Sequence, residues 1–163
     1  MDKLKLRLIK EDDNSRLAEM IRGVFIEFKA QKVGTVYSDP TTDNLYDLFK
    51  TEHSVLWVAE LNGQVEGCCG IYPTQGLNND CTELVKFYLH ANARGKGIGR
   101  ALLEKCMENA RQLAYSKIYI ESLPEFDKAV SMYHKAGFVS LDKPLTQFGH
   151  PGCNLWFLKD LEA

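Results

Sequence analysis

Apolar and polar residues alternate along several short segments, and this pattern predicts the strands of the chain. Residues 3–9 alternate charged and apolar side chains, as expected of a strand with one buried face. Residues 54–61 and 64–72 flank Asn62-Gly63, the dipeptide that most strongly favours a tight hairpin turn. The remaining predicted strands are residues 82–89, 117–122, 138–141 and 153–159.

A spacing of three to four between apolar residues predicts the helices. The first helix follows N-cap candidates at residues 11–14 and carries Leu17, Met20, Ile21, Val24, Phe25 and Phe28. Residues 31–42 have no period and predict a loop. Later helices are expected through residues 45–49, from a glycine-rich loop to about Leu113, and from Pro124 to the helix-ending Gly137. This order predicts a mixed sheet with helices on both faces.

Charge and cysteine content exclude several classes of protein. A formal net charge of −2 argues against general binding to nucleic acid or anionic membranes, so any phosphate site must be local. We find neither an apolar run of about 20 residues, as a membrane helix needs, nor a signal-peptide pattern. The five cysteines are odd in number and lack zinc-site spacing, which predicts reduced thiols in a cytoplasmic protein without a metal.

A glycine-rich loop between a predicted strand and a predicted helix carries the strongest chemical signal. Its sequence is Arg94-Gly95-Lys96-Gly97-Ile98-Gly99-Arg100. Glycines allow backbone N–H groups to approach a ligand, and a helix start adds free N–H groups and a positive dipole end. This combination predicts a pyrophosphate site. The spacing matches neither the nucleoside-triphosphate P-loop nor the Gly-x-Gly-x-x-Gly dinucleotide fingerprint.

Residues 94–99 match an Arg/Gln-x-x-Gly-x-Gly/Ala signature, and here the chain resembles the GCN5-related N-acetyltransferases, or GNAT family. Residues 83–89 resemble that family's fourth strand, and Ala129-x3-Tyr133-x3-Gly137-Phe138 resembles its helix and turn near the acyl thioester. The resemblance implies an α/β (α+β) GNAT fold over a single domain, residues 1–163. Its mixed, mostly antiparallel sheet would have about six or seven strands, helices on both faces and a splay between the fourth and fifth strands.

The resemblance also implies which residues hold acetyl-coenzyme A in the splay. The main chain of Phe87, Tyr88 and Leu89 would pair with the pantetheine arm, as an added strand pairs with an open sheet edge. The pyrophosphate would lie against Arg94, Gly95, Lys96, Gly97, Ile98, Gly99 and Arg100. Phe126 occupies a position where many members carry an asparagine that helps to hold the arm, so we transfer no hydrogen-bonding role to it.

Two catalytic candidates follow from the same resemblance. Tyr133 is similar to the family's tyrosine that protonates the departing thiolate, because a phenol with a pKa of about 10 stays protonated at neutral pH. A packed aromatic residue is the alternative. Glu83 matches a position where several members carry a glutamate base, with a substrate-ammonium anchor or a solvated strand-end acid as alternatives.

The predicted activity is direct acetyl transfer from acetyl-coenzyme A to a primary amine of a small molecule, such as an amino acid, polyamine or antibiotic. Acetylation of a protein N-terminus or lysine, and a non-catalytic acyl-coenzyme A sensor, remain as alternatives. The loop with His150 and Cys153 is expected to border the acceptor pocket, and Tyr37 with the loop at residues 33–35 is expected to shape it. Packing and turn residues are the alternative for Tyr37 and residues 33–35. A Cys/His nucleophile pair is not favoured by spacing alone. A homodimer is compatible with the sequence.

Overall fold

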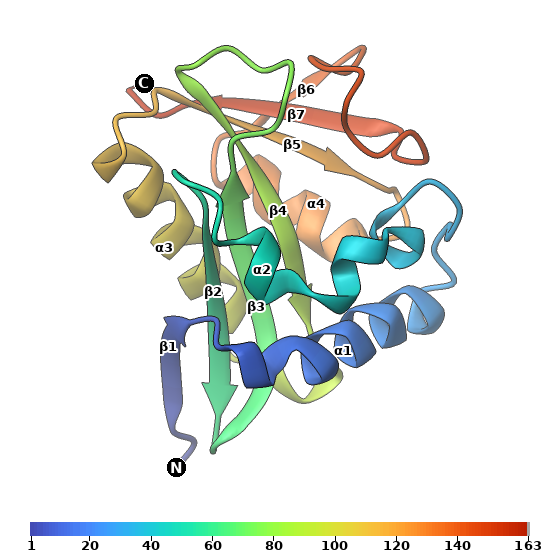
Figure 1. Ribbon diagram of the computed structural model, residues 1–163, viewed down its shortest axis with the longest axis vertical. Coiled ribbons are helices and arrows are strands. Elements are labelled where there is room, and N and C mark those ends of the chain that lie inside the picture. Colours follow the sequence, from blue (N-terminus) through green and yellow to red (C-terminus); the bar gives the residue numbers. More distant parts are fainter. Residues whose placement is uncertain (163) are drawn as a thin grey trace.

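One seven-stranded sheet organises the chain in the computed structural model, which describes residues 1–162 (Figure 1). The sheet order is β1-β2-β3-β4-β5-β7-β6, and every neighbouring pair is antiparallel except β4–β5. The predicted mixed, mostly antiparallel sheet is confirmed. The strands are β1 (Leu4–Leu8), β2 (Val55–Leu61), β3 (Gln64–Tyr72), β4 (Cys81–Leu89), β5 (Lys117–Ser122), β6 (Val139–Leu141) and β7 (Leu155–Asp160).

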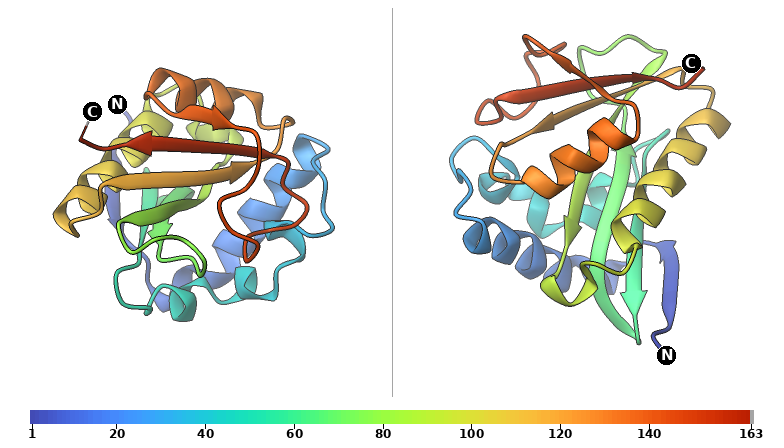
Figure 2. Two further views of the ribbon diagram at one scale, coloured as in Figure 1. Left: turned by 90° about the horizontal axis from the view of Figure 1, so that it is seen from above. Right: turned by 180° about the vertical axis from the view of Figure 1, so that it is seen from behind.

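Helices cover both faces of the sheet, as predicted (Figure 2). They are α1 (Asn14–Glu27), α2 (Leu45–Leu48), α3 (Ile98–Gln112) and α4 (Asp127–Lys135). The apolar side of α1 packs in one buried cluster with Cys68, whereas α3 and α4 pack in another with Cys69. Adjacent strand residues point to opposite faces, so β3 contributes to both clusters. None of the helices within residues 1–162 has the length and apolar character that crossing a membrane requires.

Local sequence signals explain most element boundaries. Asn62 and Gly63 both have positive φ, of 54° and 81°, as a type I′ hairpin turn requires. The prediction that Pro124 opens the last helix is wrong, because α4 begins at Asp127. Phe126 N–H donates to Leu123 O at 3.1 Å, which places Pro124 at the second position of a turn where its fixed φ is favourable. The predicted loop at 31–42 contains two short 3₁₀ turns, Val36–Ser38 and Pro40–Asp43.

The predicted splay between the fourth and fifth strands is confirmed. Only Cys81–Glu83 of β4 pair with β5, at Lys117–Tyr119. Beyond Glu83, β4 continues beside β3 while β5 continues beside β7, and the two strands diverge in Figure 1. The register of β4 against β3 shifts near Lys86, whose φ is +56°. Because a bulge bends the strand that carries it, this irregularity turns the end of β4 away from β5.

Candidate functional site

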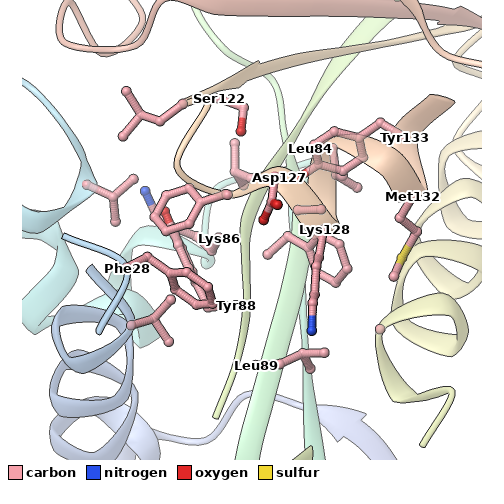
Figure 3. Close-up of a pocket in the computed structure, with 18 of the residues that line it drawn as sticks. Phe28, Leu84, Lys86, Tyr88, Leu89, Ser122, Asp127, Lys128, Met132 and Tyr133 are labelled. Carbon is pink, nitrogen blue, oxygen red and sulfur yellow. The ribbon is translucent and has the colours of Figure 1, made fainter. Parts of the chain in front are cut away.

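A cavity of about 380 Å³ lies where β4 and β5 separate (Figure 3). Its walls come from α1, β4, the glycine-rich loop, the end of β5, α4 and the loop before β7. Of the site residues predicted from the sequence, Lys96 does not line the cavity. The others do: Glu83, Phe87, Tyr88, Leu89, Arg94, Gly95, Gly97, Ile98, Gly99, Arg100 and Tyr133. The splay therefore brings together residues from three separate parts of the chain.

The glycine-rich loop forms a cradle of backbone groups at the start of α3. Gly95 and Gly97 have φ of 74° and 79°, in the left-handed region, and Gly97 is the N-cap of α3. A Cβ added to either glycine would meet nothing within 4 Å, so open space lies above them. The first helical N–H bond runs from Ala101 to Gly97 O, at 3.1 Å. The preceding amides, 98–100, are therefore available to an anion.

Gly99 has a different role from the other two glycines of the loop. Its φ is not positive, but a Cβ there would meet Leu89 Cδ1 at 3.1 Å, Met132 Cε at 3.2 Å and Phe87 Cζ at 3.3 Å. Such contacts are tighter than side chains normally allow. The absence of a side chain at this position lets the first turn of α3 pack against both β4 and α4.

The basic side chains of the loop are already engaged. The Arg94 guanidinium donates to Leu89 O at 2.9 Å and to both carboxylate oxygens of Glu27, and it lies 4.7 Å from the Phe28 ring centroid. Arg94 thus ties the loop to β4 and α1. Lys96 pairs with Asp2 at 2.8 Å and Arg100 with Glu104 at 2.9 Å, both near the surface. Exposed ion pairs contribute little to the stability of a protein. Lys96 and Arg100 can therefore exchange these partners for a phosphate at a small cost in free energy.

The main chain of β4 presents alternate residues to the splay. His90 N–H donates to Glu66 O of β3 at 2.8 Å. Since main-chain groups two residues apart point the same way, those of Tyr88 also face β3, whereas those of Phe87 and Leu89 face the gap. Leu89 O is occupied by Arg94. The ring of Tyr88 instead contributes to the wall of the cavity on the α1 side.

Phe126 belongs to an aromatic group on that wall. Its ring packs edge-on against Phe25, with centroids 5.2 Å apart and planes at 84°, and edge-on against Phe28 and Tyr88. Such edge-to-face pairs stabilise by about 0.5–1.5 kcal/mol beyond the area they bury. Phe126, to which we transferred no hydrogen-bonding role, is thus an apolar anchor that joins α4 to α1.

Glu83 is the last residue of β4 that pairs with β5, and it is only 5% exposed. Thr74 Oγ1 donates to its Oε1. Burial and the nearby Glu121 carboxyl raise the pKa of Glu83, while Thr74 and Lys86 lower it, and the result is a pKa of about 7. The carboxyl can therefore take up or release a proton close to neutral pH.

Tyr133 of α4 lines the cavity, with 4% of its surface exposed. Its ring packs against Phe157, Phe138 and Phe87 at centroid distances of 5.6, 5.9 and 6.1 Å. Burial raises the pKa of Tyr133 well above its ordinary value, so the phenol stays protonated at neutral pH. The ring of Tyr133 packs in the core, and the same side chain carries a hydroxyl group that can donate a proton at the cavity wall.

Sequence reasoning missed Lys86 and Glu121, which influence the pKa of Glu83, and Asp39, which influences the pKa of Lys86. His150 Nε2 lies 2.9 Å from Asp39 Oδ2, and His150 N–H donates to Glu121 Oε1 at 2.8 Å. Burial alone would raise the pKa of Asp39, but hydrogen bonds from Thr41 and His150 outweigh it and lower the pKa to about 2. Asp39 and His150 lie far apart along the chain, so no local spacing could have linked them.

The two loops expected to border the acceptor pocket contact each other beside the cavity, which Thr35, His150 and Cys153 line. Gly152 N–H donates to Gly34 O at 2.7 Å, and a Cβ on Gly152 would lie 2.5 Å from Val33 O. Thr146 Oγ1 similarly donates to Gln75 O at 2.7 Å. The contacts of Gly152 join the two loops and hold them against each other.

Cys153 lies in the same wall and carries a thiol rather than a thiolate. Burial raises its pKa to about 12, which disfavours a Cys/His nucleophile pair. Within residues 1–162, no group of three or more His, Cys, Asp or Glu side chains is arranged to hold a metal ion.

Comparisons with known proteins agree with this geometry. The model of the acetyltransferase (GNAT) family matches residues 17–138. The chain is 34% identical to the uncharacterized N-acetyltransferase YjgM of Escherichia coli, over 96% of this chain and 94% of that protein. A GNAT-family acetyltransferase from Staphylococcus aureus superposes with a TM-score of 0.84 at 20% identity, covering 98% and 99% of the two chains. The yncA protein of Salmonella typhimurium, solved with its cofactor acetyl-CoA, gives 0.76 at 18% identity over 99% and 95%.

The raised pKa of Glu83 makes stability depend on pH. Its pKa is about 7 in the folded protein against 4.5 ordinarily, so the folded state binds more protons between these values. This contribution to stability is present below pH 4.5 and is lost as the pH rises through 7. Relative to the wild type, we expect the free energy of unfolding of Glu83→Gln to rise by about 2 kcal/mol between pH 5 and pH 8, as measured by urea unfolding. The exposed Glu52→Gln should show no such gain, and equal pH slopes for Glu83→Gln and wild type would contradict a raised pKa.

Proposed function

The chain belongs to the GNAT family of acetyltransferases, and on that premise we propose that it transfers an acetyl group directly from acetyl-coenzyme A to a primary amine of a small molecule. The observation that carries the proposal is the coincidence of two features at one cavity. Open backbone amides at the start of α3 lie beside a strand edge freed by the splay of β4 and β5. Diphosphate and a polyamide arm, joined in one ligand, fit these two features.

Specific groups would hold the coenzyme. The amides at 98–100, above the open space of Gly95 and Gly97, would bind the pyrophosphate, with Lys96 and Arg100 adding positive charge. The main chain of Phe87 and the N–H of Leu89 would pair with the pantetheine arm. Arg94 would act indirectly, by fixing the loop to Leu89 and Glu27.

Two side chains of the cavity suit the proton transfers that such a reaction needs. Acetyl-coenzyme A supplies an activated acyl group whose carbon–sulfur bond breaks as the new carbon–nitrogen bond forms. Glu83, with a pKa of about 7, would accept the proton that the attacking amine loses. Tyr133, which stays protonated, would donate a proton to the departing sulfur.

A small acceptor in the cytoplasm is the form of the proposal that the site favours. The contact of Gly34 with Gly152 joins two loops whose neighbouring residues line the cavity, and it would restrict the entry of a protein chain there. The five free thiols suit a reducing compartment. A sensor without catalysis is the alternative from another class, but it gives no reason for Glu83 to be buried with a pKa near neutrality.

The deciding experiment mixes the protein with acetyl-coenzyme A and a panel of primary amines and measures free thiol. We expect thiol release with at least one small amine. Gly97→Ala places a Cβ at a φ of 79°, where the left-handed backbone costs about 1–2 kcal/mol, so the free loop should relax out of this conformation. Binding must then restore the conformation at that cost, and we expect coenzyme A binding in calorimetry to weaken about tenfold. The control Gly23→Ala lies in α1, where a Cβ meets nothing within 4 Å, and should bind as wild type does. Binding without thiol release from any amine would instead identify a sensor.

Removal of the Tyr133 hydroxyl tests the proposed acid. Tyr133→Phe keeps the ring that packs against Phe157 and Phe138, so folding should survive. We expect kcat to fall about 100-fold, the usual contribution of a general acid, while the Kd for coenzyme A changes less than twofold. Undiminished turnover would remove Tyr133 from the reaction.

The pH dependence of the rate tests the proposed base. A base must be deprotonated, so kcat/KM of the wild type should fall as the pH drops below about 7. The pH at which kcat/KM falls should be the same for acceptors whose amines differ in pKa, and Glu83→Gln should abolish the fall. A fall whose pH follows the pKa of the acceptor would assign the ionisation to the substrate and exclude Glu83 as the base.

A further inference from the structure

Lys86 is a buried lysine to which the proposed chemistry assigns no role. It lies in the bulge of β4 with a φ of +56°, and only 6% of its surface is exposed. Its side chain lines the cavity, among the residues drawn in Figure 3. No hydrogen bond or ion pair joins its ammonium group to another of the residues 1–162.

Burying an ammonium group without a partner is costly, and neighbouring acids do not remove the cost. Burial lowers the pKa of Lys86, although Asp39 and Glu83 act in the opposite direction. Asp39 accepts hydrogen bonds from Thr41 and His150. Glu121 accepts hydrogen bonds from Tyr119 and from the backbone of His150. Both acids are thus already bound to other donors.

The carboxyl group of Glu83 also has unused hydrogen-bonding capacity. Across the described part of the chain, its carboxyl receives one hydrogen bond, from Thr74. Glu83 and Lys86 lie three positions apart on the same strand and influence each other's pKa, yet they form no ion pair. One end of the cavity therefore presents a cation and an acid, both buried and both with hydrogen-bonding capacity to spare.

We propose that the acceptor is an α-amino acid, whose carboxylate binds the Lys86 ammonium and whose amine faces Glu83. This inference rests on the proposed acetyl transfer and narrows its substrate class. A ligand with both charges satisfies both protein groups at once, through charge-assisted hydrogen bonds. A polyamine would place a second positive charge against Lys86, and like charges at close range reject a partner.

Matched acceptors test the proposal on the wild-type protein. Each set holds an amino acid, its amide and its decarboxylated amine: alanine, alaninamide and ethylamine; leucine, leucinamide and isoamylamine; phenylalanine, phenylalaninamide and phenethylamine. We expect kcat/KM for the best amino acid to exceed that for its two analogues by at least about 100-fold, because an analogue leaves Lys86 unpaired. An equal or greater rate with the analogues would overturn the proposal and leave acetyl transfer intact.

Lys86→Met tests the residue, since methionine is similarly long and carries no charge. We expect the ratio of kcat/KM between an amino acid and its analogues to fall to within about fivefold in this variant, because KM for the amino acid rises. The affinity for coenzyme A should not change. Lys86→Gln provides a second variant should the first fail to fold, and the exposed Lys50→Met is the control. An equal fall in kcat for all three members of a set would place Lys86 in the transfer step and contradict a carboxylate anchor.

Equilibrium binding keeps the proposal testable if no acceptor releases thiol. Calorimetry with coenzyme A present would then compare the nine compounds on wild type and Lys86→Met. Amino-acid binding that Lys86→Met weakens at least tenfold would support the anchor even though the proposed function had failed. Binding that is equal in both proteins, or absent for every amino acid, would overturn it.

Discussion

The incomplete pairing of β4 and β5 is the constraint on which the rest of the site depends. A parallel pair that stopped hydrogen bonding inside a sheet would normally leave backbone groups unsatisfied, at a cost comparable to the loss of a hydrogen bond for each. Here the bulge at Lys86 bends β4 away after only three paired positions. The edge that results is shielded by α1 and α4, so it stays ready for a polyamide ligand and does not become a site of aggregation.

Much of this architecture follows from local physical signals in the sequence. The Asn62-Gly63 turn, the apolar period of α1 and the glycines of the cradle depend on backbone preferences that neighbouring residues decide. The sequence predicts too early a start for α4 because Pro124 suits both a helix start and a turn, and the contact of Phe126 with Phe25 favours the turn. Propensity is a weak prior once tertiary packing competes with it.

The charged end of the cavity could not be predicted, for a related reason. Lys86 lies between apolar residues in a segment that reads as an ordinary strand, and only the bulge reveals that its side chain enters the cavity. Asp39, Glu121 and His150 come from three separate segments and meet through long-range hydrogen bonds. The proposed roles of Glu83 and Tyr133, by contrast, were available from a family pattern, and the structure adds the burial that would tune their protonation.

The touching pair Gly34 and Gly152 has a consequence for how such a protein can diversify. Neither residue can acquire a side chain unless the opposite loop retreats, because Gly152 would collide with Val33 O and Gly34 with Gly152 N. Changes of specificity that alter the shape of one loop therefore require a compensating change about a hundred residues away. Random single substitutions would sample such paired solutions rarely, so a mutant library aimed at larger acceptors should vary both loops together.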